Sequence, residues 1–196
     1  MSEAYETTMK AKFLFLVIAS LLLFITGAMA QAYYYNVSNT FTQNGYTYLC
    51  EVDASGLVHL YNQANVYVND DDLYKNGDSL SLATRKARFD WELPVISGVN
   101  YFESRNRILA IAADVLSPNL ITGDTELSIR VTVNTSTGKV IEVGFWFLND
   151  DPFATVPVSQ YREIEQRIKA DSAIWFTLSD FGKQLNRIKL EFDYEP

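Results

Sequence analysis

The clearest hydrophobic pattern of the chain is the alternation of apolar and polar residues from Leu127 to Val133. Residues 134–138 (Asn-Thr-Ser-Thr-Gly) are typical of a turn, and an extended apolar run continues from Val140 to Leu148. A period of two is that of a β-strand, and a turn between two such runs joins antiparallel neighbours. This stretch therefore predicts a long β-hairpin.

Two other stretches have the helical period instead. Apolar residues at helical spacing predict a helix over 106–116, ended by Pro118, with a buried strand over 108–112 as the alternative. A second helix is predicted from Pro157 to Lys169. Its apolar stripe is Val158, Tyr161, Ile164 and Ile168, and its expected polar face is Arg162, Glu163, Glu165 and Lys169.

Shorter apolar and β-branched runs predict the remaining strands, with 75–100 otherwise mostly loop. These strands are expected at 46–52, 57–61, 65–68, 89–93, 174–177 and 187–192. The second half then has the order helix, strand, strand, helix, strand. We therefore expect an α+β fold with a mostly antiparallel sheet, in which a β-rich N-terminal region (31–100) and a C-terminal α+β unit (101–196) form one compact domain.

The first thirty residues are expected to be absent from the mature protein. Lys10 and Lys12 precede an uncharged apolar run from Phe13 to Ile25. Ala28-Met29-Ala30 follows, the small-residue pattern that signal peptidases cleave. The apolar run is shorter than the ~20 residues that span a bilayer. We therefore expect a signal peptide (1–30) cleaved between Ala30 and Gln31, and a periplasmic or secreted protein without a membrane span after cleavage.

Charge and composition exclude some partners. The net charge is −8, and the only cluster of basic residues is Arg85-Lys86-Arg88, so nucleic-acid binding is not expected. Cys50 is the only cysteine, which leaves no intramolecular disulfide. No cofactor or zinc motif occurs. An acidic run at 69–72 lacks the spacing of a calcium-binding loop and is interpreted as a turn, with a weak calcium site as the alternative.

The one pair with the residue types of nucleophilic chemistry is Cys50 and His59. A hairpin that opposes Val52 and Leu57 would also oppose Cys50 and His59, close enough for an imidazole to activate a thiol. The alternative is two residues on a half-buried sheet face, and a register slip of one residue would separate them.

Trp146 and Trp175 are interpreted as core residues, with a carbohydrate-stacking surface as the alternative.

Residues 106–194 resemble the C-terminal domain of the energy-transducing protein TonB. There too a hairpin with a glycine turn precedes a helix and a closing strand, and Gly138 and Gly182 stand where the turns would fall. The chain lacks the proline-rich spacer of TonB. The resemblance therefore implies the architecture and not energy transduction.

Most of the mature chain also resembles a family of small secreted proteins of unknown function from Bacteroides-type bacteria. The resemblance implies an envelope or secreted protein and brings no activity with it. The matching segments are Gly45-Tyr46-Thr47-Tyr48, Leu60-Tyr61-Asn62, Asn134-x-x-x-Gly138-Lys139, Pro152-x-Ala154-Thr155-x-Pro157-Val158-Ser159-x-Tyr161-Arg162, Ile174-Trp175-Phe176 and Gly182-Lys183-x-Leu185-Asn186.

These observations favour a non-enzymatic interaction protein of the bacterial envelope, without a cofactor or metal. An open sheet edge or an aromatic face would bind an envelope protein, a peptide or a glycan. The alternative is a small thiol-dependent hydrolase that uses Cys50 and His59.

Overall fold

The computed structural model of the 196-residue chain describes residues 35–67, 73–89, 94–98, 100–116 and 125–196. The chain divides into two units, Met1–Tyr34 and Tyr35–Pro196, and all the described residues belong to the second. The predicted signal peptide and its cleavage site at Ala30 and Gln31 lie outside the described residues.

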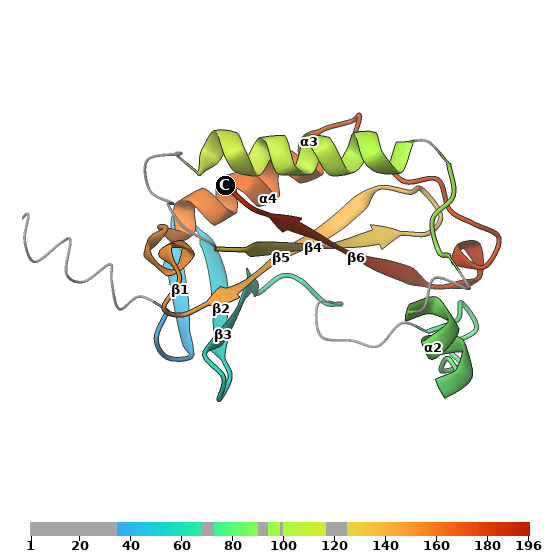
Figure 1. The fold of residues 1–196 in the computed structure, drawn as a ribbon, viewed down its shortest axis with the longest axis horizontal. Helices are drawn as coiled ribbons and strands as arrows, with labels where there is room; N and C mark the ends of the chain where they lie inside the picture. The colour runs from blue at the N-terminus through green and yellow to red at the C-terminus, as the bar shows by residue number, and fades with distance from the viewer. Residues whose placement is uncertain (1–34, 68–72, 90–93, 99, 117–124) are drawn as a thin grey trace, which may run out of the picture. The chain divides into compact units, whose positions relative to one another are not determined.

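A six-stranded antiparallel sheet dominates the unit, in the order β1-β2-β3-β5-β4-β6 (Figure 1). Strands from both predicted regions share this sheet, because β3 pairs with β5. The mixed α+β class and the antiparallel sheet are as predicted. The strands are β1 (Asn39–Gln43), β2 (Tyr46–Val52), β3 (Leu57–Asn62), β4 (Leu127–Asn134), β5 (Val140–Leu148) and β6 (Arg187–Tyr194).

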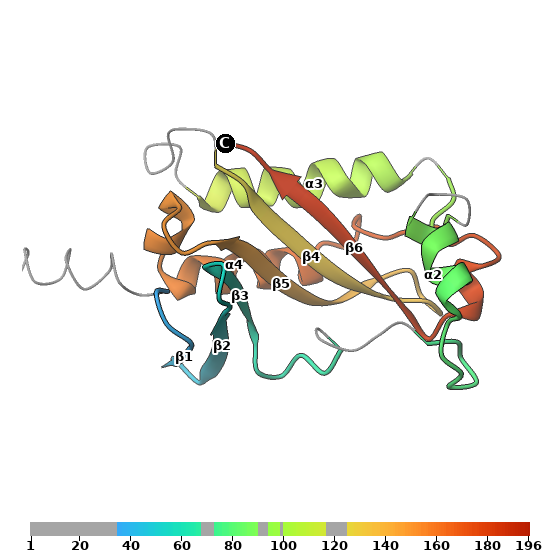
Figure 2. The ribbon, with the colours of Figure 1, turned by 60° about the horizontal axis from the view of Figure 1, so that its bottom comes forward.

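Two helices, α3 (Asn100–Val115) and α4 (Val158–Ala170), lie on one face of the sheet (Figures 1 and 2). The short helix α2 (Leu82–Phe89) lies near the beginning of β6 in both views. Two 3₁₀ turns, η1 (Pro152–Thr155) and η2 (Gly182–Gln184), complete the elements. Among the described residues, no helix is long and apolar enough to cross a membrane.

The core lies between the sheet and these two helices. The whole predicted apolar stripe of α4 is buried, and the Tyr161 ring lies 4.8 Å from that of Phe145 and stacks on that of Phe147 at 5.5 Å. Tyr101 of α3 contacts the ring of Phe192 on β6 at 5.9 Å. Each such buried side chain stabilises the fold by roughly 1.5–3 kcal/mol, so docking of these helices holds the sheet together.

The expected polar face of α4 is wrong at Glu165, which is fully buried. Its carboxylate accepts hydrogen bonds from the Tyr48 hydroxyl and from Asn62 Nδ2 at 3.2 Å. Arg162 and Lys169 of the same helix also approach it, at 3.1 and 3.3 Å. These donors compensate the cost of burying a carboxylate, which explains why a charged residue can stand in the core.

Three predicted strands are absent or lie partly outside the described residues. Residues 65–67 form a bend, because the Val66 and Tyr67 amides donate to the Glu142 carboxylate at 2.6 and 3.1 Å instead of to a strand. Residues 174–177 do not belong to any strand of the sheet. Phe89 ends α2, a helix that the sequence pattern did not predict, and residues 90–93 lie outside the described part.

Gly138 explains both the turn after β4 and the position of residues 174–177. Its φ of 69° is left-handed, a conformation that glycine adopts readily. A Cβ at this position would overlap the carbonyl oxygen of Phe176, whose own amide donates to the Gly138 carbonyl at 2.9 Å. The predicted turn is confirmed, and the absence of a side chain lets the Phe176 backbone pack against it.

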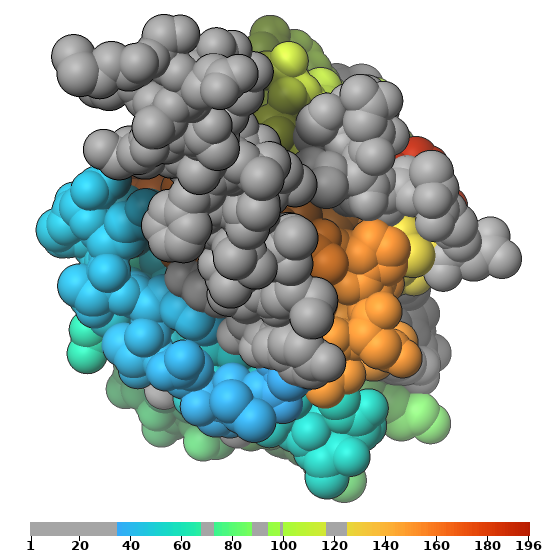
Figure 3. Space-filling model, turned by 90° about the vertical axis from the view of Figure 1, so that its left-hand side faces the viewer, coloured from blue at the N-terminus to red at the C-terminus, as the bar shows by residue number. Residues whose placement is uncertain are grey.

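Figure 3 views the unit from the end at which β1 lies and shows the side chains of this edge strand at the surface. Four of its five residues are exposed, and only Phe41 is buried. The sheet thus has β1 and β6 as its two edges.

Candidate functional site

The outer face of the sheet, meaning the face turned away from α3 and α4, carries one row of paired side chains across four strands. His59 of β3 pairs with Trp146 of β5, Trp146 with Ser128 of β4, and Ser128 with Asp193 of β6. Paired residues of neighbouring strands share a face. The antiparallel register therefore brings together an imidazole, an indole, a hydroxyl and a carboxyl from four separate parts of the sequence.

A pocket of about 510 Å³ lies on this face. We call it the outer-face pocket. Volumes of this size are typical of sites that bind small molecules or side chains. Its lining combines two leucines, an indole and an imidazole with several charged groups: Leu57, His59, Glu126, Ser128, Arg130, Trp146, Phe147, Leu148, Asp151 and Glu191.

Trp146 forms the apolar part of this site. Its side chain is only 6% exposed and packs with Tyr61 in a small cluster on the outer face, with Leu49 and Leu57 against it. The Arg130 guanidinium lies 4.2 Å from the indole centroid, a cation–π distance. Trp146 is thus buried as predicted, but in an outer-face cluster and not between the sheet and the helices. Trp175, by contrast, is 43% exposed.

Two carboxyl groups, those of Glu191 and Asp193, converge on Ser128. Its hydroxyl lies 2.6 Å from Glu191 Oε1 and 2.8 Å from Asp193 Oδ1. Arg130 pairs with Glu191 at 2.8 Å. Burial disfavours the ionised form of Glu191, but the hydrogen bonds from Ser128 and Arg130 outweigh it and lower the pKa of this carboxyl.

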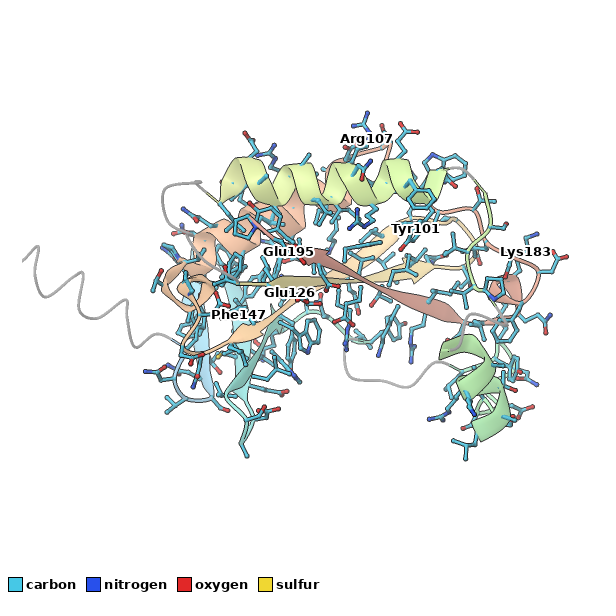
Figure 4. The ribbon with its side chains drawn as sticks, in the orientation of Figure 1. Tyr101, Arg107, Glu126, Phe147, Lys183 and Glu195 are labelled. Carbon is cyan, nitrogen blue, oxygen red and sulfur yellow. The ribbon has the colours of Figure 1, made fainter. Side chains whose placement is uncertain are left out.

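Glu126 has the opposite electrostatic surroundings. The negative charge of Asp193, followed by burial and a hydrogen bond with Asp193, raises the pKa of Glu126, and Glu195 and Glu191 add to this effect. Figure 4 shows Glu126 and Glu195 at the same end of the sheet. Burial likewise raises the pKa of Asp151. This end of the outer-face pocket is therefore crowded with acidic groups.

His59 is the only histidine of the chain. Its Nε2 atom is buried and has no hydrogen-bond partner among the described residues. Burial and the neighbouring Arg130 lower the pKa of His59, which favours the neutral imidazole. A neutral ring with its proton on Nδ1 presents Nε2 as a free hydrogen-bond acceptor.

The expected pairing of Cys50 with His59 is wrong by one residue. Cys50 pairs with Leu60 and His59 with Glu51, so the two side chains lie on opposite faces of the sheet. The cause is that Val52 pairs with Val58 and not with Leu57, which leaves five residues, 53–57, between the paired positions. Within this segment the Asp53 carboxylate accepts from the amides of Ser55 and Leu57. Burial raises the pKa of the Cys50 thiol to about 11, which disfavours the reactive thiolate.

The acidic run at 69–72 considered for calcium lies outside the described residues, whereas the nearby Asn76 and Asp78 are described. Asn76 Nδ2 donates to Asp78 Oδ2 at 2.7 Å, an interaction typical of a turn. Within the described ranges, no group of three or more histidine, cysteine or acidic residues is arranged to hold a metal ion.

Five residues of the pocket were not predicted as site residues: Glu126, Ser128, Arg130, Asp151 and Glu191. The sequence does mark three of them as polar positions of strands. Ser128 and Arg130 are polar positions of the alternating stretch 127–133, and Glu191 follows the same alternation in β6. The pairing of β4 with both β5 and β6 brings these positions together. No local pattern gives that strand order.

The fold and site define an α+β domain with helices on one face of an antiparallel sheet and a charged, aromatic pocket on the other. Residues 31–192 match the family described as "Domain of unknown function (DUF5043)". The chain therefore belongs to the DUF5043 family, which confirms the predicted membership of a family of unknown function.

A solved relative has the same fold. The crystal structure of a DUF5043 family protein from Bacteroides uniformis ATCC 8492 is 32% identical and has a TM-score of 0.70, with 83% of this chain and 88% of that chain covered. No curated protein matches this chain. The likeness to the TonB C-terminal domain is not confirmed by these comparisons and stays a prediction.

Proposed function

We propose that this DUF5043 protein is a non-enzymatic binding protein of the bacterial cell envelope, whose partner binds on the outer face of the sheet at the outer-face pocket. The observation that carries the proposal is the pocket itself: about 510 Å³, on the face turned away from the core helices, with Trp146 and Arg130 in its lining. Aromatic and arginine side chains are the residue types enriched where proteins bind partners.

The outer face supports this proposal better than a sheet edge does. The sheet has two edges, β1 and β6, and the aromatic side chain of Trp146 lines the outer-face pocket. At the edges, however, β1 is short and polar and β6 carries charged side chains, which disfavour the addition of another strand. The pocket instead combines apolar and charged groups in a concave site.

The envelope location is inferred from the sequence pattern at 9–30. The family relative from Bacteroides uniformis is compatible with a bacterial envelope protein. If export occurs as proposed, the protein recovered from its host has an intact mass that corresponds to a chain starting at Gln31. Retention of residues 1–30 would contradict this part of the proposal.

The binding proposal is tested by capture of partners from an envelope extract with tagged wild-type protein and two variants. Leu148 lines the pocket and is 47% exposed, whereas Leu82 at the beginning of α2 is 83% exposed and does not line it. We expect Leu148→Lys to lose the captured partner, because the new side chain enters the pocket, and Leu82→Lys to retain it. Equal capture by both variants would contradict binding at this pocket.

A further inference from the structure

We infer that the outer-face pocket receives a basic side chain, a lysine ammonium or an arginine guanidinium, presented by a peptide segment of the partner. This inference rests on the proposed function and adds the chemical class of the ligand. Three properties of the pocket support the inference: the charges of its lining residues, its hydrogen-bond acceptors that lack donors, and its apolar portion.

Acidic groups outnumber basic ones in the lining of the pocket. Glu126, Asp151 and Glu191 contribute three carboxyl groups, and Arg130 is the one basic side chain among the lining residues. Because Arg130 is already paired with Glu191 and lies over the Trp146 ring, its charge is directed at groups of the protein itself. The charge that remains favours a cation.

Hydrogen-bond donors are too few beside Ser128. A serine hydroxyl carries a single hydrogen, yet carboxyl oxygens of Glu191 and Asp193 lie 2.6 and 2.8 Å from it. One of these two contacts therefore lacks the serine proton. The charged groups that act on the nearby Glu126 are Asp193, Glu195 and Glu191, all acidic. A ligand that brings donors and positive charge would relieve both conditions.

His59 has a buried Nε2 atom without a hydrogen-bond partner among the described residues. In the neutral tautomer protonated at Nδ1, this atom accepts a hydrogen bond. In that tautomer the pocket offers carboxyl oxygens and a ring nitrogen as acceptors. Ammonium and guanidinium groups carry several donors and a positive charge, and no acceptor. They complement this lining better than an anion or a hydroxyl group, which also presents lone pairs.

The pocket also has an apolar portion that suits the aliphatic part of a basic side chain. Leu57, Leu148 and Trp146 give the pocket an apolar portion beside the acidic groups. Lysine and arginine carry aliphatic stems that pack on apolar surface while the charged end reaches polar groups. A metal ion has no such stem, and within the described residues no metal-binding group of side chains exists. The apolar portion beside the acidic groups therefore favours a basic side chain over a metal ion.

The test uses the purified protein and acetylated, amidated Gly-X-Gly tripeptides with X as Lys, Arg, Gln or Glu, together with butylamine and N-acetylglucosamine. Binding is measured by calorimetry and by shifts of the indole NMR signals. We expect the Lys and Arg peptides to bind at least about tenfold more tightly than the Gln peptide, a difference of about 1.4 kcal/mol, and the Glu peptide to bind weakest. Added salt weakens the binding of a cation.

A variant pair locates the binding. Glu126→Gln removes an acidic group of the pocket, and the matched control Glu163→Gln removes an exposed one on α4, whose side chain is 56% exposed. We expect only Glu126→Gln to weaken binding of the Lys peptide, by about three- to tenfold. Equal effects of both variants, or no preference for the basic peptides, would overturn the inference.

The remaining outcomes are also decisive. Binding of N-acetylglucosamine in place of the basic peptides would assign a glycan, and equally tight binding of butylamine would assign a free amine; either result overturns the peptide assignment. If Leu148→Lys abolishes partner capture but the basic peptides do not bind, the proposed function stands and this inference fails. If Leu148→Lys leaves capture unchanged, the proposed function itself fails.

Discussion

The Tyr48 hydroxyl donates a hydrogen bond to the carboxylate of Glu165, and both side chains are fully buried between the sheet and α4. The two residues are 117 positions apart in the sequence. This contact joins β2, in the N-terminal part of the sheet, to the helix that covers its C-terminal part. Burial and the adjacent carboxylate raise the pKa of Tyr48 well above its ordinary value, so the hydroxyl remains a donor.

Replacement of Tyr48 by phenylalanine is expected to destabilise the fold by about 1–3 kcal/mol, because the buried carboxylate loses a donor. Tyr46→Phe is the matched control: its hydroxyl lies at the surface, 3.5 Å from Gln43, and its loss should change stability by less than ~0.5 kcal/mol. Denaturant midpoints of the two variants measure the difference. Equal midpoints would mean that this hydrogen bond does not stabilise the fold.

Gly138→Ala is expected to be more destabilising than Gly45→Ala. Both glycines have left-handed backbones, with φ of 69° and 78°, so both variants carry the strain of an L-residue in that region. A Cβ at Gly45 meets nothing within 4 Å, whereas one at Gly138 overlaps the Phe176 carbonyl oxygen. The difference between their unfolding free energies isolates this close approach, and a difference near zero would contradict it.

Cys50 is expected to react slowly with a thiol reagent in the folded protein at pH 7. Burial raises its pKa from 9.0 to about 11, and two pKa units reduce the thiolate fraction about a hundredfold. The same chain in denaturant serves as the control and should be labelled at least that much faster. Labelling at similar rates in both states would reopen the thiol-dependent hydrolase as a function.

His59 is expected to titrate below its ordinary value of 6.5, because burial and then Arg130 lower its pKa. Since the unfolded chain binds the proton first, the contribution of neutral His59 to stability is present above pH 6.5 and is lost as the pH falls toward the folded pKa. As the chain has one histidine, its NMR titration is unambiguous.

The stability of His59→Gln, measured in parallel, should fall less steeply than that of wild type as the pH decreases from about 7 to about 5. A folded pKa at or above 6.5, or equal slopes for the two proteins, would show that the ring is not held neutral in the pocket.

The elements with a strong local period were predictable from the sequence. The stripe of α4 from Val158 to Ile168 and the alternation from Leu127 to Val133 each bury one face against the same core, so pattern and packing agree. Glu165 was placed wrongly because its burial depends on Tyr48 and Asn62, which are 117 and 103 positions away. Local periodicity contains no information on such partners.

The candidate site was less predictable than the fold, for a related reason. Its residues come from strands whose order, β3-β5-β4-β6, is not the order of the sequence. The register also depends on the turn after Val52: five residues, 53–57, lie between the paired Val52 and Val58, and this shifts His59 to the face opposite Cys50. The sequence therefore supplied the polar positions of each strand but not their juxtaposition around Trp146.

The central claim, that the partner binds at the outer-face pocket, is tested most directly by site-specific photo-crosslinking in the native host. A photoreactive amino acid replaces Leu148 at the pocket in one strain and Glu163, exposed on α4, in another. We expect a discrete crosslinked partner from position 148 and none from position 163. Crosslinking from position 163 with none from position 148 would contradict it, since the partner would then bind on the helical side of the sheet.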